Sequence, residues 1–186
     1  MTSWLRIDQA ARIILDGGII AYPTEAVFGL GCLPRNDAAL ERIIRIKHRD
    51  ARKGMILVAA EINQLESFAH FPDGEIGERM MADWPGPVTW VVAARSGVPP
   101  LLTGGRSTIA VRISDHPIVR QLCLRTGSAL VSTSANFSGR RPAKSALQAR
   151  RILGRELDYV LAGPLGNRAK PSEIRHFRTG EILRRG

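Results

Sequence analysis

Two hydrophobic periods alternate along the whole chain. Segments whose apolar side chains recur every three to four residues predict amphipathic helices, and shorter, nearly continuous apolar runs predict buried β-strands. The helices are expected at residues 5–15, 37–47 (with Asp37 as N-cap), 63–68, 74–82, 117–125 and 145–153. The strands are expected at residues 19–22, 55–60, 88–94, 108–113, 129–133, 159–161, 173–177 and 181–184.

Helices and strands interleave throughout, which predicts an α/β fold with a mixed sheet. Several strands are short and continuously apolar, as expected when helices cover both faces of the sheet. No repeat, low-complexity tract or flexible linker interrupts the pattern, so residues 1–186 are expected to form a single domain. The stretch 96–107, rich in Gly and Pro, is expected to be a loop and is our candidate for a cover over a site.

Composition places the chain among ordinary globular proteins. Apolar residues make up 44% and charged residues 24% of its 186 positions. It lacks an apolar run of the roughly 20 residues that a membrane helix needs, and the N-terminus lacks the layout of a signal peptide. Cys32 and Cys123 lie far apart and have no partner at metal-ligand spacing. We therefore expect a cytoplasmic protein with reduced thiols, no membrane contact and no protein-bound metal.

Charge is distributed unevenly. The net charge is +10, and residues 94–186 carry 17 basic and 5 acidic side chains, whereas residues 1–93 carry 10 and 12. Most of the cations are arginines, whose planar guanidinium groups suit two-pronged contact with phosphate or carboxylate. The basic half predicts an anionic partner, either a nucleotide or a nucleic acid, although solubility alone would explain any single surface arginine.

Known phosphate-binding and hydrolytic motifs are missing. The sequence contains no GxxxxGK[ST], GxGxxG, GxSxG or HExxH motif. The four histidines are scattered, so zinc chemistry is not expected.

Thr24 follows a buried strand that Pro23 ends. Ligands of open α/β sheets bind outside the carboxyl ends of strands, so Thr24 is placed to offer its hydroxyl to a ligand. The alternative is a turn in which Thr24 caps the next segment.

Lys47 and Arg49 lie between a predicted helix and a predicted strand. Residues two apart point the same way in an extended chain but not on a helix. If this connector is extended, both cations aim at one point, which suits a polyphosphate. The alternative is a solvated helix C-terminus, where cations offset the helix dipole.

Two strands carry polar residues on one face. Strand 108–113 alternates apolar residues with Thr108, Ala110 and Arg112, and a buried guanidinium needs an anion, either an Asp or Glu or a ligand carboxylate. The next strand leads into Ser132, Ser134 and Asn136, short donors that suit phosphate or ribose. A serine nucleophile would need a general base, and the sequence shows no candidate base near these serines. We therefore expect the serines to bind a ligand rather than to act in covalent catalysis.

Six motifs appear in a familiar order and span nearly the whole chain. Together they resemble the short bacterial form of the YrdC-type threonylcarbamoyl-AMP synthases. The motifs are YPTEAVFGLG at 22–31, KHR at 47–49, WPGPVT at 84–89, AVR…DHP at 110–117, STSANFSG at 132–139 and PS at 171–172.

The resemblance implies a twisted, open, mixed α/β sheet with helices on both faces around a basic concave cavity. It also implies an L-threonylcarbamoyladenylate synthase, which is a nucleotidyltransferase. Such enzymes use L-threonine, bicarbonate and ATP, with Mg²⁺ carried on the nucleotide, for tRNA threonylcarbamoyladenosine modification. By position, Lys47 and Arg49 are the expected catalytic residues. Nucleotide contacts are expected from Lys53, Thr108, Ser134, Asn136 and Arg184, and threonine contacts from Thr24, Arg112, Ser132 and Ser172.

The resemblance also implies a downstream complex that transfers the threonylcarbamoyl group. The main alternative is a non-catalytic RNA-binding module, because the basic C-terminal half suits contact with tRNA or other RNA. A carbamoyl-transfer subunit that hydrolyses carbamoyl-phosphate is a third hypothesis.

Overall fold

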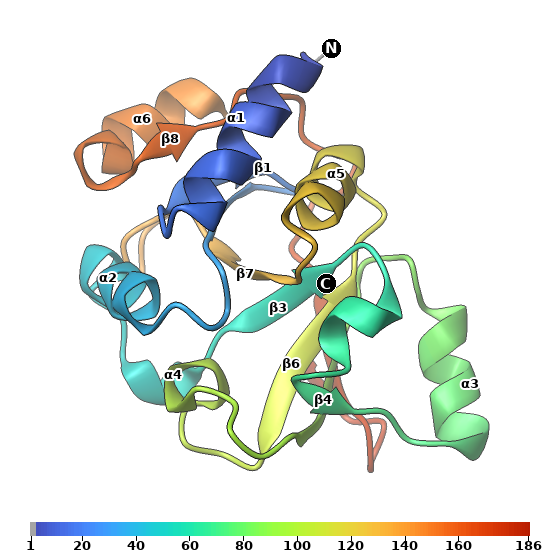
Figure 1. The fold of residues 1–186 in the computed structure, drawn as a ribbon. Helices are drawn as coiled ribbons and strands as arrows, with labels where there is room; N and C mark the ends of the chain where they lie inside the picture. The colour runs from blue at the N-terminus through green and yellow to red at the C-terminus, as the bar shows by residue number, and fades with distance from the viewer. Residues whose placement is uncertain (1–2) are drawn as a thin grey trace.

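The computed structural model describes residues 3–186, in which ten strands form one mixed sheet (Figure 1). The α-helices are α1 Trp4–Leu15, α2 Asp37–Lys47, α3 Gly74–Ala82, α4 Pro100–Thr103, α5 Pro117–Thr126 and α6 Ala146–Leu153, and the 3₁₀ helices are η1 Ala51–Lys53, η2 Ile62–Leu65 and η3 Gly154–Glu156. The strands are β1 Ile20–Pro23, β2 Phe28–Gly31, β3 Ile56–Ala59, β4 Ala69–His70, β5 Val88–Ala94, β6 Thr108–Ile113, β7 Leu130–Ser134, β8 Tyr159–Val160, β9 Glu173–His176 and β10 Ile182–Arg184.

The sheet is open and mixed, as predicted. Its order is β10-β9-β5-β6-β3-β7-β2-β1-β8, and β4 pairs with β5 at the side. The pairs β3–β6, β5–β9 and β1–β8 are parallel, and the remaining pairs are antiparallel. The C-terminal hairpin β9–β10 therefore joins the sheet through β5, and in the strand order it stands at the opposite end from β1 and β2.

Helices cover both faces, which confirms the layered prediction. On one face, Leu57, Val111 and Val131 sit in register and belong to the core under α2, α3 and α6. On the other face, Val58 and Leu130 pack under α1 and α5. The cover on this second face is incomplete, because polar side chains of β6 and β7 on the same face, such as Arg112 and Ser132, line a cavity.

Several local predictions were wrong. β2 was not predicted because its sequence, FGLG, has only two apolar side chains, and the two-residue β4 is too short to show a period. The predicted loop 96–107 contains α4, where Leu102 is fully packed. The N-cap of α2 is Asn36, whose side chain accepts from Ala39 N at 2.9 Å, so Asp37 is the first helical residue.

None of the helices that the structure describes is long and apolar enough to cross a membrane.

Candidate functional site

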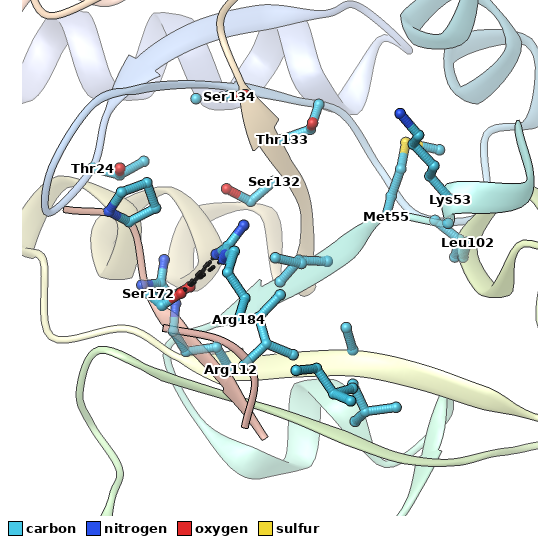
Figure 2. Close-up of a pocket in the computed structure, with 18 of the residues that line it drawn as sticks. Thr24, Lys53, Met55, Leu102, Arg112, Ser132, Thr133, Ser134, Ser172 and Arg184 are labelled. Atoms are coloured by element: carbon cyan, nitrogen blue, oxygen red, sulfur yellow. Dashed lines mark hydrogen bonds between the residues drawn. The ribbon is translucent and has the colours of Figure 1, made fainter. Parts of the chain in front are cut away.

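A cavity of about 570 Å³ opens on the half of the sheet that α1 and α5 leave uncovered. It receives residues from parts of the chain that are far apart in the sequence, between Thr24 and Arg184 (Figure 2). The predicted site residues that line it are Thr24, Arg49, Lys53, Thr108, Arg112, Ser132, Ser134, Ser172 and Arg184. Lys47 and Asn136, also predicted, are not among its lining residues.

Lys47 lies behind the cavity wall. It ends α2, and His48 takes a left-handed conformation (φ 47°), so the expected extended connector from Lys47 to Arg49 is wrong. The Lys47 side chain is 1% exposed and its Nζ donates to Ser134 O, to Asn136 O at 2.9 Å and to Asn136 Oδ1 at 3.1 Å. Burial and then the charge of Arg49 lower the pKa of Lys47 to about 7. Lys47 thus supports the segment that leaves β7.

Arg49 reaches the cavity from the loop after α2. Its Nη2 donates to Gly54 O at 2.9 Å, while its buried Nε finds no acceptor among residues 3–186. Burial lowers the pKa of Arg49, because the guanidinium has lost water, and the charge of Asp50 only partly offsets this loss. A buried, incompletely satisfied guanidinium at a cavity wall is a candidate anion contact.

The wall beside Arg49 is built by close backbone packing. Gly54 and Gly104 face each other, and a Cβ on Gly104 would lie 2.3 Å from Arg52 O. We call this contact between the Gly54 and Gly104 segments the seam. Arg106 spans it and donates to Arg52 O at 2.6 Å and to Lys53 O at 3.3 Å. Lys53 and Arg106 therefore join Arg49 at one end of the cavity, together with the apolar Met55 and Leu102. The stretch 96–107, predicted as a loop and a cover, forms part of this packed wall.

The end of β7 supplies hydroxyl groups. Ser132 and Ser134 line the cavity, and Ser134 Oγ donates to Asn136 Oδ1 at 2.6 Å. Gly29, the neighbour of Ser134 in β2, leaves space here, since a Cβ on it would lie 3.2 Å from Thr24 Cγ2.

Thr24 caps a turn, which was the alternative prediction to a role in ligand binding. Its hydroxyl donates to Val27 O at 2.7 Å, and its backbone N–H bonds the same oxygen. Thr24 still lines the cavity, so its hydroxyl oxygen can accept a hydrogen bond from a ligand there.

Arg112 and Glu25 form a buried ion pair at the opposite end. Arg112 Nη2 lies 3.0 Å from Glu25 Oε2, and each residue is 6% exposed. Glu25 was not predicted as a site residue. The signal was available, because a buried guanidinium requires an anion and Glu25 follows Thr24 directly.

The C-terminal hairpin closes this end. Arg184 of β10 donates to Ser172 O at 2.7 Å and to Ser172 Oγ at 3.1 Å, as the dashed lines in Figure 2 show. Ser172 Oγ in turn lies 2.9 Å from Thr89 Oγ1. Burial and then the charge of Arg112 lower the pKa of Arg184, so two guanidinium groups share one end of the cavity.

Cations therefore gather at both ends of one hollow. Arg49, Lys53 and Arg106 occupy one end, and Arg112 and Arg184 the other. Two cationic ends joined by hydroxyl groups suit two anionic ligands held side by side, a polyphosphate and a carboxylate. The fold and the cavity define an α/β protein with a cationic cavity on an open mixed sheet, and the chemistry of this cavity suits a nucleotide beside a small acid.

Comparison with known proteins identifies the family. The sequence model named Sua5_yciO_yrdC, described as "Telomere recombination", matches residues 12–186. The chain belongs to this Sua5/YciO/YrdC family.

Individual relatives are similar over most of the chain. The threonylcarbamoyl-AMP synthase of Nitrosococcus oceani is 54% identical over 179 residues, covering 96% of this chain and 97% of the relative. P. abyssi Sua5 complexed with L-threonine superposes with a TM-score of 0.86 at 31% identity over 91% of this chain, which spans about half of the Sua5 chain. E. coli YciO superposes with a TM-score of 0.82 at 28% identity, covering 96% of this chain and 87% of YciO.

Proposed function

We propose that this protein is an L-threonylcarbamoyladenylate synthase of the nucleotidyltransferase class. The observation that carries the proposal is the cavity into which nine predicted site residues from separate segments converge. The high identity to proteins named threonylcarbamoyl-AMP synthase and the threonine complex of a structural neighbour support it. The same findings favour catalysis over a module that only binds RNA.

The proposed reaction uses L-threonine, bicarbonate or CO₂, and ATP. The threonine amine adds to CO₂ and loses a proton, which gives a carbamate. A carbamate oxygen then attacks the α-phosphorus, the bond to the bridging oxygen breaks, and pyrophosphate leaves. Negative charge accumulates on phosphate oxygens during this step, so catalysis rests on positioning and on cations rather than on a side-chain nucleophile.

We assign the phosphates to the end that holds Arg49 and Lys53. The unpartnered Nε of Arg49 supports this assignment, because an anion would satisfy it. Thr108, Ser134 and Arg184 are proposed nucleotide contacts. Lys47 and Asn136 are proposed to act from behind the wall by holding Ser134 in place.

We assign threonine to the end that holds Arg112, which is proposed to bind its carboxylate. Thr24 offers an oxygen acceptor that suits the threonine amino group. Ser132 and Ser172 line the same part of the cavity and are proposed to complete this site.

Mg²⁺ is proposed to arrive on ATP as part of the substrate. Groups of three or more His, Cys, Asp or Glu side chains that could hold a metal are absent from residues 3–186. We also propose a cytoplasmic protein that hands its adenylate to a downstream transfer complex and contacts tRNA through its basic half.

The decisive experiment is incubation with threonine, ¹⁴C-bicarbonate and ATP, followed by chromatography for a labelled acyl-adenylate. We expect label in the adenylate and one pyrophosphate for each adenylate formed, with both products absent when threonine is omitted. Hydrolysis of ATP without threonine dependence, or no label in the adenylate, would refute the proposal.

A further inference from the structure

The Glu25 carboxylate is held at both of its oxygens. Oε2 contacts Arg112 Nη2 at 3.0 Å, and Oε1 accepts from Ser114 Oγ. The Ser114 hydroxyl oxygen also accepts from His116 N at 3.2 Å, which fixes the serine itself. The result is a chain of contacts from the start of α5 through Glu25 to the guanidinium of Arg112.

The charge state of Glu25 fits this arrangement. Burial raises the pKa of Glu25, but Arg112, Ser114 and lesser contacts outweigh burial, so the pKa lies below its ordinary value. Glu25 is therefore ionised at neutral pH, and it pairs with Arg112 as a charge-assisted contact.

Arg112 is only partly satisfied by this contact. The buried Nε of Arg112 has no hydrogen-bond acceptor among residues 3–186. The side chain also lines the cavity, where a ligand could supply an acceptor. Arg184 lies close enough for the charge of Arg112 to lower its pKa. Without Glu25, two like charges would face each other and the Arg112 guanidinium would have no fixed orientation.

We propose that Glu25 is a positioning residue for amino-acid binding. By engaging one edge of Arg112, it turns the remaining N–H groups towards the cavity and so sets affinity for the carboxylate of the amino-acid substrate, with a much smaller effect on nucleotide affinity. This inference rests on the proposed function, with Arg112 as the carboxylate contact.

The test compares Glu25→Ala with Glu25→Gln in steady-state kinetics, varying threonine and ATP separately. Loss of the side chain in Glu25→Ala should raise KM for threonine about tenfold or more and leave KM for ATP within about twofold. Glu25→Gln keeps an oxygen that accepts from Arg112, so it should recover most of the threonine affinity. Asp115→Asn, which neutralises an exposed carboxylate nearby, serves as the matched control and should behave like the wild type.

A double-mutant cycle tests whether Glu25 acts through Arg112. In an Arg112→Lys background, Glu25→Ala should cause less than about a twofold further rise in KM for threonine. Independent, multiplying effects of the two substitutions would overturn the proposal. So would a lower KM for threonine in Glu25→Ala, because the carboxylate would then act only by repelling the substrate anion.

Ser114→Ala keeps the inference testable if Glu25→Ala does not fold. This variant loosens Glu25 while leaving Arg112 paired, and a threonine-specific rise in KM would support the proposal. Equal effects on threonine and ATP, or no effect, would overturn it. If the wild type itself shows no threonine-dependent adenylate formation, the proposed function fails; if the wild type is active and the variants match it, only the inference about Glu25 fails.

Discussion

At the scale of single residues, the cations of the KHR motif differ sharply in environment. Arg49 lines the cavity with an unsatisfied Nε, whereas Lys47 is buried with three acceptors. An extended connector would have aimed both side chains at one point, but the left-handed His48 separates them. One motif therefore supplies a guanidinium that lines the cavity and an ammonium group that supports its wall.

Arg49→Ala should abolish most adenylate formation while the protein stays folded. The side chain makes one hydrogen bond, to Gly54 O, so its loss costs little stability, but it removes the proposed phosphate contact. Pyrophosphate release and circular dichroism measure the two effects. Arg52→Ala is the control, since Arg52 is exposed and pairs with Asp50, and it should keep full activity. Near-normal turnover in Arg49→Ala would contradict the assignment.

Lys47→Met should destabilise the protein as well as inactivate it. The substitution removes the ammonium group that donates to Ser134 O and to both oxygens of Asn136, and it leaves the buried Asn136 O without a donor, which should cost about 2–3 kcal/mol of unfolding free energy. Urea titration measures this loss. Lys144→Met, at an exposed position, is the control and should change the unfolding free energy by close to zero. An inactive Lys47→Met of unchanged stability would show that Lys47 contacts the substrate instead.

Glu25 should make the protein sensitive to acid. Its pKa is lowered from 4.5 in the fold because Arg112, Ser114 and lesser contacts, including the charge of His116, outweigh burial. A carboxylate with a depressed folded pKa stabilises the protein above pH 4.5, and this contribution is lost as the pH falls through the folded pKa. Unfolding free energy measured against pH should thus fall more steeply below pH 4.5 in the wild type than in Glu25→Gln. Parallel curves would contradict the ionised pair.

At the scale of elements, the cavity depends on how closely α4 approaches η1. Met55 N bonds Leu102 O at 2.9 Å, and Gly104 touches the backbone of Arg52. Neither glycine of this seam was singled out from the sequence, because close approach of two backbones leaves no hydrophobic period.

Gly104→Ala should separate α4 from η1 and weaken ATP binding. Its Cβ would collide with Arg52 O, whereas a Cβ on Gly105 would meet nothing within 4 Å. Both glycines have positive φ, so Gly105→Ala carries the same backbone strain, about 1 kcal/mol, without the collision. In thermal unfolding, Gly104→Ala should lose roughly 1–3 kcal/mol more unfolding free energy than Gly105→Ala. It should also show a higher KM for ATP than Gly105→Ala. Equal stability of the two variants would contradict the claim that close packing of Gly104 against Arg52 supports the cavity wall.

At the scale of the whole molecule, the two halves of the chain divide the charge. An exposed basic run follows the STSANFSG motif and extends through α6 into η3. Its cations do not line the cavity and are Arg140, Arg141, Lys144, Arg150, Arg151 and Arg155. The cavity accounts for other cations of the same half, such as Arg106 and Arg112. Net charge alone did not separate these two sets, because only the fold decides which arginines face inwards.

Charge reversal on α6 should weaken tRNA binding and spare adenylate formation. Arg150→Glu with Arg151→Glu removes two exposed cations, so the slope of log affinity against log salt should become shallower by about one for each phosphate that the protein no longer neutralises. Filter binding at several salt concentrations measures this, and Arg79→Glu on α3 is the control. Unchanged tRNA affinity would exclude α6 as the contact surface.

The sequence alone determined the α/β class, most element positions and the polar faces of β6 and β7, because burial imposes a period on side chains that is local to each segment. The residue motifs also indicated the family. Only the tertiary structure decided that Lys47 lies behind the wall and that the partner of Arg112 is Glu25. Such contacts join residues far apart in the chain, and pairing across that separation follows from the register and packing of strands rather than from any local pattern.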